Sequence, residues 1–413
     1  MGNYPSVASR VVENAAPGRE VASQAPPTFA TISSEDSFAA LGAGWDALVR
    51  AMPRPSPFLL HGWLTEWWRH YGDGCELAVQ TAFRDRRLVA ALPLLTYRRR
   101  GLEVATFLGG RHSALADLLL EDDEDLAVAS TLVDRAASSG HDYLDVFGLP
   151  GASRLAAASK TRALHLFQRV EAPVLDLSDG WDATYQAKTN GKKRAHHRHR
   201  RRQVEALGKV EVSVARTLRD LEPALEHAFR LHALRWRGRP DGSGFVTPTG
   251  IRFNRAALRA LAGADVARIL TLEVDGRAIA FSWYIALEGR MYLYRTAFDP
   301  AFAHCSPGLV NTLNLLEIAA AEGLTRVEFL GGAERYKVEF SDRFEPLYMG
   351  LGLPGSVAGG AAVATRARWL GLRDAAKKSE AARQLYNRMA PARRRLTRAP
   401  DVLRPSGVAE RGR

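Results

Sequence analysis

The most informative stretch of this chain occurs twice, as AASSGHDYLDVFGL at residues 136–149 and as AAAEGLTRVEFLGG at residues 319–332. In each copy the apolar residues change from the spacing of a helix to the spacing of a strand. A glycine separates the two patterns, Gly140 in the first copy and Gly323 in the second. This self-similarity predicts that the chain contains one structural unit in duplicate.

The segments around the two copies follow a single order of helix, helix, hairpin, strand, helix and strand. For the first unit the sequence predicts helices over 37–52 and 62–71, a hairpin over 76–97, a strand over 103–108, a helix over 124–140 and a strand over 143–149. For the second unit it predicts helices over 220–236 and 250–262, a hairpin over 268–287, a strand over 290–298, a helix over 306–323 and a strand over 327–332. This order predicts an α/β fold with mixed sheets, present in tandem.

Positive charge is concentrated in two segments. Of the net charge of +12, residues 188–202 carry +8 and residues 356–413 carry +10, which leaves −6 for the rest of the chain. The high pI is therefore weak evidence that the folded body binds polyanions. Composition and charge divide the chain into a disordered segment (1–33), a first α/β unit (34–187), a basic helix between the units (188–210), a second α/β unit (211–355) and a basic tail that is helical and then disordered (356–413).

Cysteine content and hydropathy indicate a cytoplasmic protein. Cys75 and Cys305 are too few for a disulfide framework and lack the spacing of a metal site. No stretch approaches the ~20 consecutive apolar residues of a membrane span, and the first residues contain no signal-peptide core. The basic tail, which carries Trp369 and Leu372, would either pack on the body or lie on an anionic membrane surface. Membrane association and oligomeric state stay open at this point.

Residues 323–351 read GLTRVEFLGGAERYKVEFSDRFEPLYMGL. A strand that ends in an acidic residue and glycines, then a Tyr-Lys pair and a last strand, resembles the signature of the CelD-like (cellulose-biosynthesis) acyltransferases. These are double-GNAT proteins related to the Fem-type aminoacyltransferases of cell-wall synthesis. The stretches PFLLHGWLTEWWRHYG (57–72), LHALRW (231–236) and FDPAFAHCSPG (298–308) agree with this resemblance, which covers residues 38–353.

The resemblance implies acetyl-CoA or another acyl-CoA as co-substrate, bound where the fourth and fifth strands of the second unit separate. Its pyrophosphate would meet the N-terminus of the following helix, where the first N–H groups lack partners within the helix. Ser306 is the expected N-cap residue and Pro307 the first helical residue. The usual phosphate loop of this fold contains more glycine, so an ordinary capped helix also fits these residues. The residues expected to contact the donor are Tyr294, Arg295, Thr296, Ser306, Gly308 and Leu309.

The resemblance also implies a catalytic role for Lys337, because Fem-type enzymes have a lysine at a similar position. We expect Lys337 to stabilise charge that develops during acyl transfer, Tyr336 to donate a proton and Glu334 to act as base. His232 is a secondary candidate for the base, because it shares a helical face with Trp236. A surface lysine beside a core tyrosine, and a histidine satisfied within the core, remain the alternatives for Lys337 and His232.

The run NGKKRAHHRHRRR at residues 190–202 is predicted to form a helix between the units. Its histidines are too close together to share one helical face, and no metal is expected. It contains no aromatic residue on which bases could stack, and no DNA partner is expected. We predict that one face of this helix, with part of LHALRW, holds an anionic small-molecule or glycan acceptor; a solvated basic face or an RNA-binding arm fits the same run. The residues assigned to the acceptor are Arg194, Arg198, Arg201, Arg235 and Trp236.

Three functions are consistent with these patterns. The first is an acyl-CoA-dependent N-acyltransferase that modifies an amino sugar or a related amine, in exopolysaccharide or cell-envelope biosynthesis. The second is a Fem-type aminoacyl-tRNA-dependent transferase, and the third is a non-catalytic binding protein on a GNAT fold. We expect only the second unit to bind donor, because no Tyr-Lys pair follows VFGLPG at residues 146–151.

Overall fold

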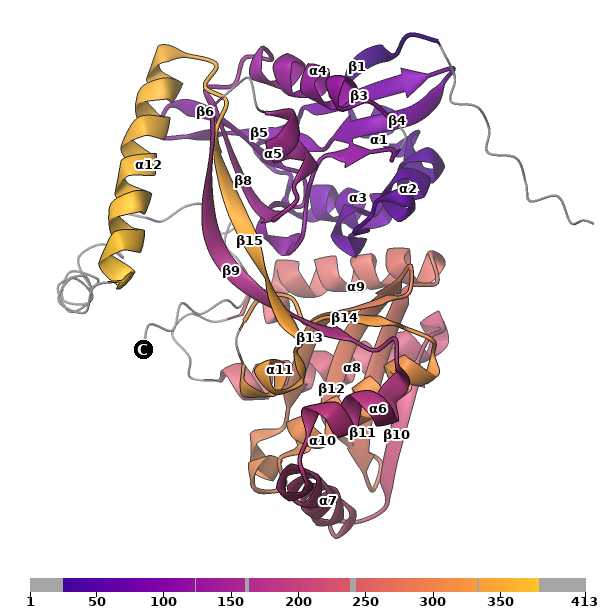
Figure 1. The fold of residues 1–413 in the computed structure, drawn as a ribbon. Helices are drawn as coiled ribbons and strands as arrows, with labels where there is room; N and C mark the ends of the chain where they lie inside the picture. Colours follow the sequence, from indigo (N-terminus) through magenta and orange to yellow (C-terminus); the bar gives the residue numbers. More distant parts are fainter. Residues whose placement is uncertain (1–24, 123, 160–162, 238–242, 333, 379–413) are drawn as a thin grey trace, which may run out of the picture.

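The computed structural model describes residues 25–122, 124–159, 163–237, 243–332 and 334–378, and they form two α/β halves in the predicted order (Figure 1). The expected disordered segment falls mostly outside the described residues, as does the tail beyond residue 378. Among the described residues, no helix combines the length and apolar character that a membrane span requires.

The N-terminal half contains every predicted element of the first unit, but it divides the predicted hairpin. Its elements are β1 (Thr28–Ile32), α1 (Glu35–Ala39), α2 (Gly42–Ala51), η1 (Pro57–Leu59), α3 (His61–Tyr71), β2 (Cys75–Leu77), β3 (Val79–Arg84), β4 (Arg87–Leu92), β5 (Leu94–Arg99), β6 (Leu102–Phe107), η2 (Gly110–His112), β7 (Leu119–Leu120), α4 (Leu126–Ala137), β8 (Tyr143–Pro150), α5 (Arg154–Ala158) and β9 (Leu164–Asp176).

Two boundaries predicted for this half are wrong. The helix predicted over 37–52 is two helices, α1 and α2. The two strands predicted over 76–97 are four, because β3 and β4 join β1 and β7 in a four-stranded sheet, whereas β2 and β5 join an eleven-stranded sheet. Pro93 lies at the break between β4 and β5, where its missing N–H cannot weaken a ladder.

The C-terminal half begins after β9 and follows the prediction for the second unit closely. Its elements are α6 (Gly180–Lys188), α7 (Gly191–Glu205), β10 (Val210–Ala215), α8 (Leu218–Trp236), η3 (Gly244–Val246), α9 (Pro248–Gly263), β11 (Ala267–Val274), β12 (Arg277–Leu287), β13 (Arg290–Phe298), η4 (Pro300–Cys305), α10 (Pro307–Ala321), β14 (Arg326–Glu328), α11 (Arg335–Phe340), β15 (Arg343–Gly352) and α12 (Val357–Lys378).

Strands β9 and β15 join the two halves into one sheet, which the sequence did not predict. The order of the eleven strands is β10-β11-β12-β13-β14-β9-β15-β8-β6-β5-β2. β9 begins in the N-terminal half, where Leu164 pairs with Gly352, and ends in the C-terminal half, where Val174 pairs with Glu328. β15 runs antiparallel to β9, so it begins in the C-terminal half and ends in the N-terminal half (Figure 1). Each half therefore contains a strand segment that the other half supplies.

Helices cover both faces of the sheet in the C-terminal half. Side chains of α8 share one core cluster with Ile269 and Trp283, whereas side chains of α10 share another with Leu270 and Tyr284. Because successive residues of a strand point to opposite faces, α8 and α10 lie on opposite faces of this sheet. α7 packs against α10, and it therefore lies on the α10 side.

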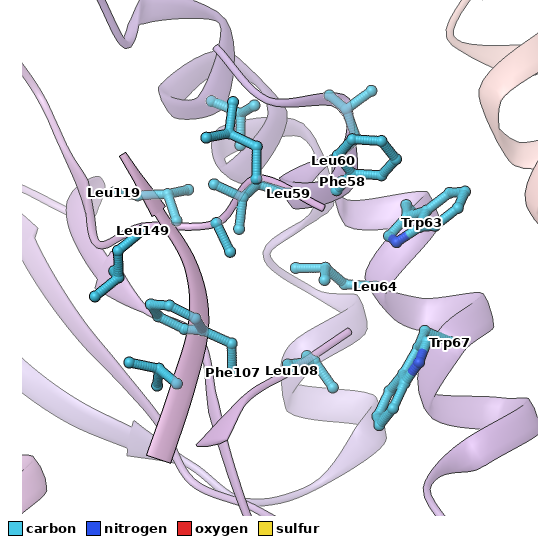
Figure 2. Packing of buried hydrophobic residues seen from close by; sticks show 14 of the residues in the cluster. Phe58, Leu59, Leu60, Trp63, Leu64, Trp67, Phe107, Leu108, Leu119 and Leu149 are labelled. Carbon is cyan, nitrogen blue, oxygen red and sulfur yellow. The ribbon is translucent and has the colours of Figure 1, made fainter. Parts of the chain in front are cut away.

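The core of the N-terminal half is built around α3. Trp63 and Trp67 are fully buried, and Figure 2 shows Leu64 pointing toward the side that carries Phe107 and Leu149. Gly62 lies where α3 crosses α9 of the other half, since a Cβ added there would lie 2.9 Å from the Cβ of Ala260. The two halves therefore meet through closely packed helices as well as through the shared sheet.

A buried ion network also joins the halves. Glu328 of β14 has no exposed surface and accepts hydrogen bonds from Arg54 of the N-terminal half and from Arg326, each at 2.8 Å. Arg54 also pairs with Glu345 of β15 at 2.9 Å. One arginine of the N-terminal half thus neutralises two carboxylates of the C-terminal half.

Replacing Glu328 with alanine should destabilise the protein strongly. The change removes the fully buried carboxylate that Arg54 and Arg326 share and leaves both arginines paired with Glu345 alone. Removal of one partner from a buried ion pair costs about 3–5 kcal/mol. Urea unfolding of the variant measures this loss. Glu345→Ala is the matched control, with an expected loss of about 1 kcal/mol, because that side chain is 24% exposed and water can solvate its partners. Equal losses for the two variants would contradict this account.

The described part of the basic tail packs on the N-terminal half, as one of the two expectations for it stated. Val363 and Leu370 of α12 are buried. Arg366 pairs with Asp145 of β8, and Asp374 accepts a hydrogen bond from Arg169 of β9 at 2.9 Å. α12 therefore lies along the sheet where β8, β15 and β9 run together (Figure 1).

Candidate functional site

Strands β13 and β14 separate after a short parallel ladder. Only residues 290–292 of β13 pair with residues 326–328 of β14, although β13 continues to Phe298. Beyond Glu328 the chain turns away through Leu330 and Gly332, which both have positive φ. Among the described residues, no strand pairs with this edge of β13 from Leu293 onward. The structure therefore has the strand separation that the resemblance implied.

A β-bulge in β13 directs two neighbouring side chains to the same face of the sheet. Trp283 pairs with Arg295 and Tyr284 pairs with Leu293, so Tyr294 is an extra residue on β13. The guanidinium of Arg295 lies 4.1 Å from the ring centre of Tyr294 and 5.8 Å from that of Phe245, which belongs to the α8 side. Strict alternation would have placed Arg295 on the α10 side.

Of the other residues expected to contact the donor, two use their polar groups within the fold. The hydroxyl of Thr296 donates to the carbonyl of Phe281 at 2.9 Å. The N–H of Leu309 donates to the carbonyl of Ser306 at 3.0 Å, inside the first turn of α10.

The N-terminus of α10 lies beside the end of β13. Pro307 is the first helical residue, as predicted, but Ser306 has left-handed backbone angles and its side chain makes no capping hydrogen bond. Ser306 is therefore the N-cap residue, as expected, but its side chain does not cap the helix. A Cβ on Gly308 would lie 2.9 Å from the ring of Phe298, and the guanidinium of Arg235 lies 5.0 Å from the centre of that ring. Arg235 of α8 thus lies close to the start of α10.

Lys337 is buried on the other side of the strand separation. Its ammonium group donates to the carbonyl of Gly331 at 3.0 Å and pairs with the carboxylate of Glu334 at 3.0 Å. Burial lowers the pKa of Lys337, Glu334 opposes this effect, and the charge of Arg295 adds to it. Burial raises the pKa of Tyr336, so its phenol stays protonated at neutral pH and can donate a hydrogen bond.

His232 of α8 lies on the same side as Arg295. Its ring stacks on Trp236 at 5.7 Å between ring centres and lies 4.8 Å from Phe245. Burial, together with the charges of Arg295 and Arg235, lowers the pKa of His232 to about 3. A neutral imidazole of such low basicity is a poor proton acceptor at neutral pH, which leaves His232 as part of the aromatic wall of the site.

The structure brings most of the predicted residues together, but it places the arginines of α7 elsewhere. Arg201 pairs with Glu317 on α10 at 3.0 Å, and Arg194 donates to the carbonyl of Thr189 at 2.6 Å. Arg198 is exposed. Because α7 packs on α10, these side chains lie on the opposite face of the sheet from Arg235 and Trp236. The two sets of acceptor residues do not converge.

Two residues of the N-terminal half lie near Arg295 and were missed from the sequence. The charge of Arg295 lowers the pKa of His112, and it also acts on Tyr71. His112 stacks on Tyr71 at 4.6 Å and lies 5.6 Å from Phe253 of α9. Tyr71 belongs to the stretch that carries the resemblance, whereas nothing in the sequence around His112 distinguished it.

The corresponding strands of the N-terminal half also separate early, but the chain itself fills the space between them. β6 and β8 pair in parallel only at Val104 with Tyr143 and Ala105 with Leu144. Beyond this point the N–H of Ala116 donates to the carbonyl of Gly148 at 3.1 Å. This edge of β8 is therefore occupied by protein backbone.

Among the described residues, no group of His, Cys, Asp or Glu side chains has a geometry that could hold a metal ion.

Two buried histidines should make the folded state sensitive to acid. Burial lowers the pKa of both His112 and His232 from 6.5 to about 3. Between these pH values the unfolded chain binds more protons, so stability is complete above pH 6.5 and falls as the pH drops toward 3, by up to about 1.4 kcal/mol per pH unit for each histidine. Urea unfolding between pH 4 and 7 measures the slope. His232→Phe should reduce this slope, whereas the exposed His196→Phe should not, and equal slopes would contradict the assignment.

Comparison with known proteins identifies one domain and the shared fold. The profile of the acetyltransferase (GNAT) domain matches residues 191–338. The structure resembles that of FemX, with a TM-score of 0.54 and 13% identity over 77% of this chain and 96% of that one. It also resembles a conserved protein of unknown function from Bacteroides thetaiotaomicron, with a TM-score of 0.51 and 13% identity over 78% and 99% of the two chains.

A third similar structure is a C-terminal domain (DUF2156) from Agrobacterium fabrum, described as part of a lysylphosphatidylglycerol synthetase. Its TM-score is 0.50, with 13% identity over 82% of this chain and 97% of that one. No curated protein matches the chain. The expected α/β fold of two GNAT-like units is thus confirmed, and residues 191–338 form an acetyltransferase (GNAT) domain.

Proposed function

We propose that the C-terminal half transfers an acyl group from acyl-CoA to an amine, at the point where β13 and β14 separate. The observation that carries this proposal is the edge of β13 from Leu293 to Phe298, with which no described strand pairs. Phe298 at its end lies beside the start of α10, and the charge of Arg295 acts on the buried ammonium group of Lys337. Backbone N–H and C=O groups on such an edge require partners, and the amide-rich pantetheine chain of CoA can supply them. The first N–H groups of α10 suit its pyrophosphate.

In the reaction the amine nitrogen attacks the thioester carbonyl carbon, the carbon–sulfur bond breaks, and the amine loses a proton while the thiolate gains one. Lys337 stabilises the negative charge that develops on the carbonyl oxygen, because a cation fixed in a buried site needs no reorganisation. Tyr336 stays protonated and donates a hydrogen bond to the leaving thiolate, which gains the proton that the amine loses. Glu334, whose side chain is 46% exposed, accepts the amine proton directly or through water.

The proposed acceptor is an amino sugar or a related amine of exopolysaccharide or cell-envelope biosynthesis. Only the resemblance of residues 38–353 to the CelD-like acyltransferases supports this finer assignment. The backbone contact between Ala116 and Gly148 supports the further proposal that the N-terminal half binds no donor, since it lies where β8 separates from β6, the counterpart of β13.

Thiol release from acetyl-CoA tests the function. The full chain should release CoA in the presence of glucosamine or other amines faster than in their absence, and CoA should raise its melting temperature, because a ligand that binds only the folded state stabilises it. Gly308→Val, which would force the ring of Phe298 to move, should reduce the CoA-induced shift, while Gly371→Val, with nothing within 4 Å of the added Cβ, should not. Absence of both thiol release and a CoA-induced shift with acetyl-, succinyl- and longer acyl-CoA would overturn the proposal.

A second candidate is transfer from an aminoacyl-tRNA, which the placement of α7 favours. Arg200 donates to the carbonyl of His304 in η4, directly before α10, and Arg198 and Arg202, which share another face of α7, are exposed. Exposed arginines on a helix that contacts η4 could bind RNA phosphates. Transfer of a labelled amino acid from charged tRNA, without any CoA-induced stabilisation, would select this candidate over the first.

A further inference from the structure

A cavity of about 190 Å³ lies at the start of β13, at the end of this strand that is farthest from Phe298. Three arginines line it, Arg290 of β13, Arg326 of β14 and Arg343 of β15. A cavity of about 150 Å³ in another protein holds a benzene molecule, so this space suffices for a small organic acid or a phosphate. The proposed acyl transfer uses none of these arginines.

Shared carboxylate oxygens hold the three guanidinium groups close together. Arg326 and Arg343 both donate to Oε1 of Glu345, at 2.8 and 3.0 Å. Arg326 also donates to Oε1 of Glu328 at 2.8 Å, and Nη1 of Arg290 lies 3.6 Å from the same oxygen. Arg290 and Arg326 are direct neighbours in the parallel ladder of β13 and β14. The fold thus fixes three cations around one cavity.

Positive charge exceeds negative charge in this network. Among the described residues, four arginines, Arg54 and the three of the cavity, share two carboxylates, those of Glu328 and Glu345. Like charges on neighbouring strands repel one another, so a further anion beside them is favourable. The excess charge therefore favours an anionic ligand.

Two other carboxylates line the cavity, and each already has a partner. Glu288 accepts a hydrogen bond from Arg50 at 2.8 Å. Asp176 accepts the N–H of Ser178 at 2.9 Å. Hydrogen bonds from Ser178 lower the pKa of Asp176, and the charges of two cavity arginines add to this effect. The arginines therefore keep the cavity electropositive even though Asp176 lies in its wall.

Two of the arginines retain N–H groups for a ligand. In the part of the chain that the structure describes, Nη1 of Arg326 and both Nη atoms of Arg343 have no hydrogen-bond partner. Nη1 of Arg326 is not fully buried, and the side chain of Arg343 is 47% exposed, so a ligand can reach these groups. Arg290 contributes its charge, because its Nη1 is fully buried and its Nη2 donates to the carbonyl of Pro53 at 2.9 Å.

We propose that this cavity binds the phosphate or carboxylate group of a small molecule, through N–H groups of Arg326 and Arg343 and the charge of Arg290. Guanidinium groups present N–H donors in a planar arrangement that matches the oxygens of both anions. Arg290 and Arg54 also contact residues of the other half, so the ligand would bind where the two halves meet. The proposal is independent of the acyl transfer at the far end of β13.

Thermal unfolding of the full chain tests this site. Inorganic phosphate and acetate are titrated separately, at constant ionic strength set by chloride, and the melting temperature is measured at each concentration. We expect a saturable rise with at least one of the two anions, because a ligand of the folded state stabilises it. The anion with the lower half-saturating concentration identifies the recognised group. Absence of a saturable rise with both anions would overturn the proposal.

Two variants with opposite expected effects place the anion in this cavity. Arg343→Gln should raise the half-saturating concentration about tenfold or more, since it removes a charged donor. Arg255→Gln is the matched control, because that arginine is 46% exposed and pairs with Glu226 at 2.8 Å; it should leave the concentration unchanged. Asp176→Asn should lower the concentration severalfold, because it removes a negative charge and keeps an oxygen for the N–H of Ser178.

The two effects separate ligand binding from a structural role of the arginine. An unchanged titration in Arg343→Gln would show that the anion binds elsewhere. If Arg343→Gln unfolds in chloride alone, Asp176→Asn decides, and an equal or higher half-saturating concentration in that variant would refute the site. CoA-induced stabilisation and thiol release do not depend on this cavity, so they report on the proposed function separately.

Discussion

Cutting the chain between Ser178 and Asp179 should leave two fragments, neither of which folds alone. Fragment 1–178 keeps β9 but loses β15, which lies between β9 and β8 in the sheet of the N-terminal half. Leu144 and Val146 of β8, now fully buried, would then lie on an exposed strand edge with unpaired backbone groups. Fragment 179–413 loses the segment of β9 that separates β14 from β15. Circular dichroism and gel filtration of each fragment measure the result.

Co-expression of the two fragments is the control for this experiment. Ser178 and Asp179 are both exposed, so the cut itself removes no buried contact. The fragments should associate as soon as both are present and purify as a 1:1 complex with a cooperative unfolding transition. If fragment 1–178 unfolds cooperatively as a monomer, the exchange of β9 and β15 is not needed for folding, and our account of the sheet is wrong.

Lys337→Met should abolish most of the acyl transfer activity while leaving the protein folded. Methionine has a similar length and suits a site in which the lysine is only 7% exposed. The variant removes one partner of the ion pair, but the remaining carboxylate of Glu334 is 46% exposed and can be solvated by water, so the loss of stability should be small. Loss of one preorganised group that stabilises charge typically lowers kcat about 10²–10³-fold. Amine-dependent thiol release from acetyl-CoA measures this effect.

Lys209→Met is the matched control, because its side chain is 79% exposed and its ammonium group pairs with Glu211 on the surface. Its kcat should equal that of the unmodified protein. Melting temperatures of both variants should stay within a few degrees of the parent chain, which separates a catalytic effect from unfolding. Full activity of Lys337→Met would remove this lysine from the mechanism, whereas loss of activity together with unfolding would assign it a structural role only.

Much of the second unit could be predicted from sequence, because its elements carry regular local signals. The bounds predicted for α8, α10 and β13 from helical spacing and strand alternation agree with the structure within two residues. The basic helix α7 begins at a clear N-cap, since the side chain of Asn190 accepts the N–H of Lys193. The first unit was predicted less well, because Pro93 divides a continuous apolar run that reads as one strand.

The candidate site was only partly predictable, for a physical reason that particular residues show. Lys337, Tyr336 and Arg295 could be selected because they lie close in sequence to motifs that carry the resemblance. His112 could not, because its role depends on Trp67, on Tyr71 and on a strand far away in the chain. The arginines of α7 were predicted to lie beside Arg235 and Trp236, but they lie on the opposite face of the sheet. Helical periodicity predicts which residues share a face of a helix, but not which element that face contacts.

By itself the sequence determined the duplicated α/β units, their order of elements and the lysine next to the second copy of the repeat. These features depend on local periodicity, on turns and on caps, which neighbouring residues specify. Only the tertiary structure decided that β9 and β15 cross between the halves, that a bulge at Tyr294 turns Arg295 toward α8, and that Glu328 is neutralised by Arg54. These contacts join residues that are far apart in the chain. They are stabilised by burial and by the neutralisation of charges, and neither effect can be predicted from the residues next to them in the sequence.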